Sequence, residues 1–245
     1  LSTLPVEFSE SLTIRIFPQE KTPMLEDLFL FPFQYKRLQK WLTEDTGIIL
    51  FTGPTGSGKS TTMYAMLEHL IKTRSTQVIT LEEPIERKID HVLQVEVNER
   101  AGVTYQNGLK AALRHDPDVL LIGEVRDEQT AAFSVRASLT GHLVLTTLHA
   151  KDALGTIQRL VDLGINRNDL SQSLIGIASL QLIPIMKEGE VRSRAAIAEM
   201  LDGPSLKKAI SENVICDENF LSFEQLKRKA LRHGFIRDEM HPESS

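Results

Sequence analysis

A glycine-rich segment of the chain holds residue types that bind phosphate. Residues 53–60 read GPTGSGKS and fit the pattern G-x-x-x-x-G-K-[ST], which predicts a site for ATP and Mg²⁺. Its glycines let the backbone turn tightly, so that N–H groups face a phosphate at the N-terminus of the next helix. Lys59 supplies a charge for the β and γ phosphates, the hydroxyl of Ser60 suits Mg²⁺, and Thr61 reaches toward the α phosphate. The predicted nucleotide-binding residues are Gly53, Pro54, Thr55, Gly56, Ser57, Gly58, Lys59, Ser60 and Thr61.

Acidic side chains follow two apolar runs of the kind that form buried strands. Glu124 follows the run 119–123, and Glu82 and Glu83 follow the run 78–81. In an open α/β sheet, ligands bind outside the carboxyl ends of the strands. These carboxylates are therefore candidates to act at the γ-phosphate edge of the nucleotide, with Glu124 first. Taken alone, Glu82 and Glu83 are also compatible with a solvated loop that follows a strand.

Two histidines bracket a further apolar run. His142 and His149 flank residues 143–148 and lie seven positions apart, so a regular strand would point them to opposite sides. Each histidine alone is compatible with an ordinary hydrogen-bonded residue as well as with a functional one.

The elements that must position these residues alternate between strands and helices. Such alternation predicts an α/β fold with a mostly parallel sheet, covered by helices on both faces. Residues 170–186 are uncharged but include polar residues and fall short of the ~20 apolar residues of a membrane helix, so we predict a buried helix there. The predicted strands are 12–17, 48–52, 77–82, 92–97, 119–123, 143–148 and 195–201, and the predicted helices are 33–42, 59–72, 105–114, 128–139, 152–163, 205–211 and 222–233.

Composition narrows the class of protein. The chain has 245 residues, 41% of them hydrophobic and 25% charged, which is typical of a globular protein with a sizeable core. A formal charge of −5 argues against a surface that binds nucleic acid broadly, so no direct nucleic-acid contact is expected. The single cysteine, Cys216, excludes a four-cysteine zinc site, and no zinc is expected. Because the chain opens at Leu1 without a methionine, we expect a further region before it.

Five stretches of the chain, taken together, resemble the secretion ATPases that power type II secretion, type IV pili and competence pseudopili. The resemblance implies a RecA-like P-loop ATPase core that works as a homohexamer. It also implies a cytoplasmic location, peripheral at the cell membrane, and an inner-membrane platform protein as partner. The five stretches are the phosphate loop at 53–61, the acidic box at 81–86, the segments 113–118 and 123–127 of a second nucleotide motif, the histidine box at 140–150, and residues 1–5 with 14–16.

The resemblance also implies roles for individual residues. Glu124 corresponds to the acidic residue of the second motif, and Glu82 to the glutamate that positions or activates water. His142 and His149 would couple the site to its surroundings. Arg15 matches an arginine that reaches the γ-phosphate when the ring closes, although an arginine on a strand is equally compatible with a surface position.

The sequence departs from the family pattern in three places. Glu83 stands where the family usually has aspartate, so its role relative to Glu82 stays open. No arginine accompanies Gln181, and the chain runs from Ile185 to the next strand without a four-cysteine module. Retraction ATPases of type IV pili also lack that module, whereas the residues Ser2–Pro5 are closer to the assembly branch. The preferred subclass is the assembly ATPase of a competence pseudopilus.

The expected domains are an N-terminal remnant and linker at 1–20, the ATPase core at 21–185 and a small C-terminal, largely helical subdomain at 186–245. The predicted function is a hexameric motor that hydrolyses ATP to assemble a competence or type II secretion-like pseudopilus. Three alternatives stay open: a retraction ATPase, a nucleotide-binding scaffold without useful turnover, and a nucleic-acid motor. The last rests on the basic run 227–229, which more simply forms a solvated helix face.

Overall fold

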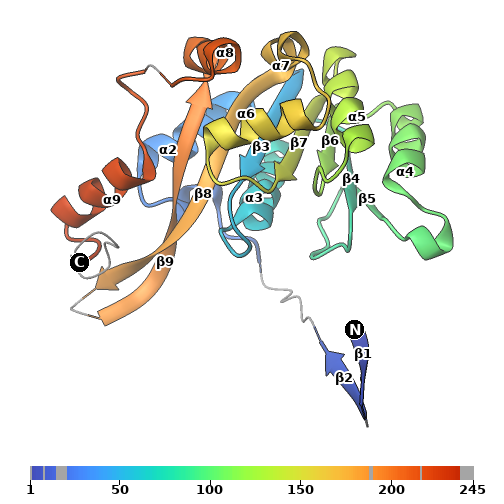
Figure 1. Cartoon of the computed structure of the whole chain (residues 1–245), viewed down its shortest axis with the longest axis horizontal. Helices are drawn as coiled ribbons and strands as arrows, with labels where there is room; N and C mark the ends of the chain where they lie inside the picture. Colours follow the sequence, from blue (N-terminus) through green and yellow to red (C-terminus); the bar gives the residue numbers. More distant parts are fainter. Residues whose placement is uncertain (1, 8, 15–20, 188–189, 216, 238–245) are drawn as a thin grey trace.

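A seven-stranded sheet organises the protein (Figure 1). The computed structural model describes residues 2–7, 9–14, 21–187, 190–215 and 217–237. The strand order is β5-β4-β6-β7-β3-β8-β9; neighbouring strands run parallel except β8 and β9, which pair antiparallel. The strands of this sheet are β3 (Gly47–Thr52), β4 (Val78–Glu82), β5 (Leu93–Glu96), β6 (Val119–Ile122), β7 (Leu143–Leu148), β8 (Leu174–Lys187) and β9 (Glu190–Asp202).

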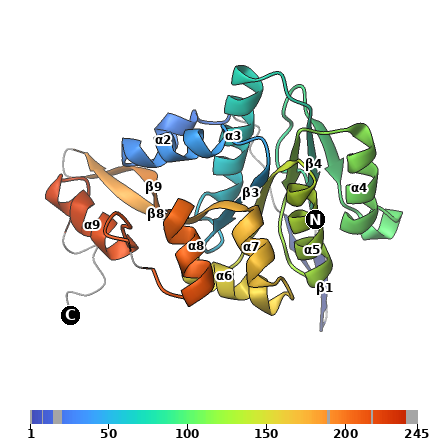
Figure 2. The same ribbon diagram turned by 90° about the horizontal axis from the view of Figure 1, so that it is seen from above.

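Helices cover both faces of the sheet, as the alternation of strands and helices predicts (Figure 2). One face packs against α1 (Leu25–Leu28), α2 (Pro32–Trp41) and α3 (Lys59–Thr73). The other packs against α4 (Tyr105–Ala112), α5 (Glu128–Leu139), α6 (Ala153–Asp162), α7 (Arg167–Ser173) and α8 (Gly203–Glu212). The outer half of the β8–β9 hairpin packs against α9 (Phe223–Arg232).

The central strands are apolar on both faces. In β3, Ile48 and Leu50 belong to the core on one side of the sheet, whereas Ile49 and Phe51 belong to the core on the other. Side chains alternate between faces along a strand, so a strand that is covered on both sides is apolar along most of its length. This explains why the predicted strands of the core agree with β3, β4, β6 and β7 within a residue or two at each end.

The helix predicted for residues 170–186 is wrong. Only the first part is helical, in α7, and the chain then enters β8, which pairs with β3 on one side and β9 on the other. Gly176 and Pro184 disfavour a helix interior, and the isoleucines at 175, 177, 183 and 185 favour a strand. An added Cβ at Gly176 would lie 2.5 Å from the Trp41 ring, so α2 packs directly on the backbone of this strand.

The strands near the two ends of the chain can be compared with the predicted domain boundaries. Strands β1 (Ser2–Val6) and β2 (Ser9–Thr13) form a separate two-stranded sheet (Figure 1). The strand predicted at 12–17 overlaps β2 at two residues, and Arg15 lies outside the described residues. The predicted boundary between residues 185 and 186 falls within β8, and β9 belongs to the same sheet as the core. The division into three domains stays a prediction. Among the described residues, none of the helices has the length and apolar character needed to span a membrane.

A charged contact ties α2 to the end of β9. The guanidinium of Arg37 donates to both carboxylate oxygens of Asp202, at 2.6 and 2.7 Å, and the Trp41 indole donates to the same carboxylate. Burial alone would raise the pKa of Asp202, but the hydrogen bonds from Arg37 and Trp41 hold it below its ordinary value. Bidentate arginine–carboxylate pairs are among the stronger polar contacts in proteins.

Asp202→Asn should lower the free energy of unfolding at pH 7 by about 1.5–3 kcal/mol, the range for hydrogen bonds to a charged group. Because the folded-state pKa lies below the unfolded one, this stabilisation is present above about pH 4 and is lost as the pH falls through the folded-state pKa. Urea unfolding of both proteins between neutral and acid pH measures the difference. Asp45→Asn is the control: the Asp45 side chain is 88% exposed in its ion pair with Arg74, so the substitution should cost less than about 1 kcal/mol. A loss for Asp202→Asn that is equal at every pH would contradict the electrostatic explanation.

Candidate functional site

A pocket of about 420 Å³ lies where the carboxyl ends of β3, β4, β6 and β7 meet the N-terminus of α3. Ligands bind at this edge in open α/β sheets. Most of the pocket's polar groups come from three sources: the phosphate loop, the loops after β4 and β6, and the end of β7. The lining includes Thr55, Gly56, Gly58, Lys59, Ser60, Thr61, Tyr64, Glu82, Glu83, Tyr105, Glu124, Arg126, Thr147 and His149.

The phosphate loop joins β3 to α3, as its sequence predicts. Gly53, Gly56 and Gly58 have φ angles of 134°, 79° and 97°, a region that favours glycine. At Gly53 an added Cβ would also lie 2.5 Å from the Leu180 carbonyl oxygen of β8. Glycine is therefore required there both by the backbone angle and by the close approach of a neighbouring strand.

Lys59 is the first residue of α3, and its side chain reaches back to the start of the phosphate loop. Its ammonium donates to the carbonyl oxygens of Gly53 and Pro54, at 2.7 and 2.9 Å. Burial lowers the pKa of Lys59, and the negative charge of Glu124 raises it in part. A phosphate entering the loop would offer the ammonium a charged acceptor in place of neutral carbonyl groups.

The pocket also offers oxygen groups that suit Mg²⁺. The Ser60 hydroxyl and the carboxylates of Glu82 and Glu124 line the same space. Within the part of the chain that the structure describes, no cluster of three or more His, Cys, Asp or Glu residues could hold a metal ion. The Ser60 hydroxyl is an oxygen ligand of the kind that Mg²⁺ takes.

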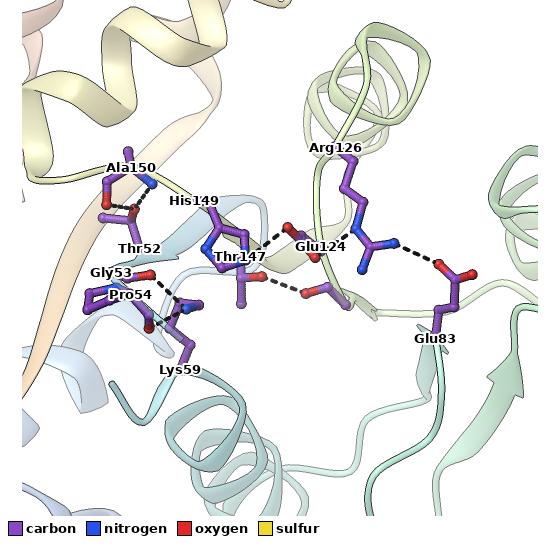
Figure 3. A network of polar contacts seen from close by, with 11 residues as sticks. Thr52, Gly53, Pro54, Lys59, Glu83, Glu124, Arg126, Thr147, His149 and Ala150 are labelled. Carbon is purple, nitrogen blue, oxygen red and sulfur yellow. Dashed lines mark hydrogen bonds and ion pairs between the residues drawn. The ribbon is translucent and has the colours of Figure 1, made fainter. Parts of the chain in front are cut away.

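A polar network crosses the far wall of the pocket (Figure 3). His149 Nε2 lies 3.2 Å from Glu124 Oε1, and Arg126 Nε donates to Glu124 Oε2 at 2.8 Å. Arg126 also donates to Glu83 Oε2 at 3.0 Å. The hydrogen bond to Glu124 raises the pKa of Arg126, so its guanidinium stays charged between the two carboxylates. One arginine thus offsets the repulsion between acidic residues at the ends of β4 and β6.

Glu82 and Glu83 occupy different environments although they are adjacent in sequence. Glu82 is only 5% exposed, and its carboxylate accepts hydrogen bonds from Tyr64, Thr80 and Gln94. The side chain of Glu83 is 40% exposed and pairs with Arg126. The alternative of a solvated loop after the strand therefore describes Glu83 but not Glu82, which is the last residue of β4.

The structure brings one of the two predicted histidines to the pocket. His149 contacts Glu124, whereas His142 lies at the opposite end of β7, where its Nδ1 is 3.0 Å from the Ala137 carbonyl oxygen. The two residues are thus separated by the length of the strand. Whether either of them couples the site to its surroundings stays a prediction, as does the role of Arg15.

Several pocket residues were not singled out from the sequence. Arg126 stands inside the second nucleotide motif, but its link to Glu83 depends on the pairing of β4 with β6. Tyr64 lies just over one turn into α3, and an aromatic residue at such a position usually indicates a side chain of the hydrophobic core. Tyr105 lies at the start of α4, and burial followed by the charge of Glu83 raises its pKa to about 12. Thr147 donates to the Gly123 carbonyl oxygen at 2.7 Å and ties β7 to β6.

Comparison with known proteins gives a consistent result. Residues 1–233 match the family described as "Type II/IV secretion system protein". The chain is similar to the competence protein ComGA of Bacillus subtilis (strain 168), with 42% identity over 251 residues that cover 96% of this chain and 70% of that protein. It is also similar to the type II secretion system protein E of Dickeya dadantii (strain 3937), with 44% identity over 184 residues that cover 75% of this chain and 37% of that protein.

A solved structure shows the same fold. The pilus retraction motor PilT with bound ADP superimposes with a TM-score of 0.81 and 36% identity, covering 94% of this chain and 69% of that one. Together with the parallel sheet, this likeness confirms the predicted RecA-like α/β fold.

Lys59→Ala should weaken ATP binding by about 10- to 100-fold, because a charge-assisted hydrogen bond to phosphate is lost. Fluorescence anisotropy with a labelled ATP analogue measures the affinity. Lys72→Ala, on the same helix with a side chain that is 71% exposed, is the matched control and should bind ATP like the wild type. Equal ATP affinities for the wild type and both variants would show that Lys59 does not contribute to ATP binding.

Proposed function

Because the chain belongs to the family of type II/IV secretion system proteins, we propose that it is a motor ATPase that powers assembly of a competence or type II secretion-like pseudopilus. One observation carries the proposal. A phosphate loop and two glutamates from neighbouring strand ends share one pocket, in a chain that is 42% identical to a competence protein over nearly its whole length.

The residues of the pocket divide the work of hydrolysis. The loop amides and Lys59 bind the phosphates, and Ser60 contributes a ligand for Mg²⁺, which when bound offsets phosphate charge. Glu82 orients a water molecule toward the γ-phosphorus. The water oxygen forms a bond to that phosphorus while the bond from the phosphorus to the bridging oxygen breaks; the electron pair of the broken bond stays on ADP, and the protons of the water leave with the inorganic phosphate. Glu124, whose carboxylate is fixed by His149 and Arg126, polarises water and places a negative charge at the γ-phosphate edge of the pocket.

The proposal extends to the assembly. The protein acts as a homohexamer at the cytoplasmic face of the cell membrane, where it moves an inner-membrane platform protein. Arg15 reaches the nucleotide of a neighbouring subunit when the ring closes, and His142 and His149 link the state of the site to the rest of the core. The support for this assembly is the family membership.

Pilus retraction is the second candidate, because a retraction motor is similar over 94% of this chain. The nucleic-acid motor has less support. On α9, Arg228 pairs with Glu224, and the Lys229 ammonium lies 5.2 and 5.1 Å from the ring centres of Phe31 and Phe33. Arg228 and Lys229 are both exposed, which agrees with a solvated helix face, and each already contacts side chains of the protein itself.

The decisive biochemical experiment is Mg²⁺-dependent ATPase activity of the full-length protein over a concentration series, with the mass followed by light scattering. Turnover per chain should rise as hexamers form, because each site is completed by a neighbouring subunit. Equal turnover in a monomer would overturn completion in trans. Tight ATP binding without turnover in the hexamer would favour the scaffold.

Assembly and retraction predict opposite phenotypes. In a competent host whose own gene is replaced by a Glu82→Gln variant, an assembly motor leaves the cells without pseudopili, whereas a retraction motor leaves them with excess filaments. Counting filaments on cells by electron microscopy separates the two. Replacement with the wild-type gene is the control, and excess filaments would contradict the assembly proposal.

A further inference from the structure

The carboxylate of Glu82 is held by uncharged donors from three elements. Thr80 precedes it by two residues on β4 and so points to the same face, with its hydroxyl 2.6 Å from Glu82 Oε1. Gln94 of the neighbouring strand β5 donates to the same oxygen at 3.2 Å. Tyr64 of α3 donates its phenol to Oε2. Within the described ranges, no lysine, arginine or histidine forms an ion pair with Glu82.

The distribution of these donors leaves one acceptor position open. A carboxylate has about four lone-pair sites, two on each oxygen. Thr80 and Gln94 fill the two sites of Oε1, while Tyr64 takes one of the two on Oε2. The remaining site lies on Oε2, beside the phenol. A water molecule that Glu82 orients would therefore bind there, and its direction depends on where Tyr64 places the carboxylate.

Tyr64 differs from the other two donors in the element that carries it. Gln94 is fixed by the loop between β4 and β5, since it also donates to the Arg87 carbonyl oxygen and accepts from the Ile89 N–H, both at 2.8 Å. Tyr64 stands on α3, five residues after Lys59, and is 5% exposed. Burial and the hydrogen bond to Glu82 raise the pKa of its phenol well above the ordinary value, so it stays a donor at neutral pH. It connects the helix that binds phosphate to the strand that carries the glutamate.

We propose that Tyr64 is a positioning residue for ATP hydrolysis: its phenol fixes Glu82 Oε2 relative to the phosphate loop, and so fixes the water that attacks the γ-phosphorus. The proposal rests on the proposed function, in which Glu82 orients that water. It assigns a separate part to Thr80 and Gln94, which hold Oε1 and satisfy the buried charge without facing the water.

The test uses the full-length protein with Tyr64→Phe, which keeps the ring and removes the hydroxyl. The turnover number should fall roughly 10- to 100-fold, the effect of a lost hydrogen bond to a charged group, while the affinity for ATP stays within about twofold. Tyr35→Phe, a half-buried tyrosine on α2 outside the pocket, is the matched control and should retain wild-type turnover. Melting temperatures close to that of the wild type should show that all variants are folded.

A double-mutant cycle separates positioning from a structural effect. Tyr64→Phe should lower turnover only when Glu82 is present, and should add nothing to Glu82→Gln. An equal further loss in the Glu82→Gln background, or wild-type turnover in Tyr64→Phe, would overturn the inference and leave the proposed function intact. Full turnover in Glu82→Gln would instead overturn the role of Glu82 itself.

Discussion

The register of four neighbouring parallel strands is the constraint on which the site depends. Leu81 of β4 lies opposite Ile122 of β6, which lies opposite Thr146 of β7. Phe51 of β3 lies opposite the next residue of β7. The strands therefore end at one level of the sheet, and the residues that follow them enter the same pocket. A slip of one residue in any pair would turn the apolar side chains of that strand to the wrong faces, so the two cores fix the site as they fix the fold.

The negatively charged side chains of the pocket are stabilised in two ways. Arg126 lies between Glu124 and Glu83, which keeps two carboxylates close together in the pocket. Glu82 is buried without a cation partner among the described residues, and neutral donors satisfy it instead. These environments suit different work: a paired carboxylate holds its place beside phosphate and metal, whereas one with an open lone-pair site can orient water.

The β8–β9 hairpin links the site to the rest of the molecule. Its first strand supports the phosphate loop where the Leu180 carbonyl approaches Gly53. Its second strand ends at Asp202, which is bonded to Arg37 and Trp41 of α2. The residues beyond the predicted core boundary are thus continuous with the sheet that carries the nucleotide pocket. The hairpin thus contacts both α2 and the phosphate loop.

The local pattern of residue types along the chain was sufficient to predict much of the fold and of the candidate site. The phosphate loop, the acidic strand ends and most elements of the core follow from residues close in sequence, because strand burial and tight turns restrict which residue types fit. For residues 174–187 the local residue preferences favour a strand, but the length of β8 and its place between β3 and β9 depend on partners that lie far away in the chain. The sequence did not separate Glu82 from Glu83 or His149 from His142. Those assignments depend on which side chains from distant elements, Tyr64 and Arg126 among them, reach the same carboxylate in three dimensions.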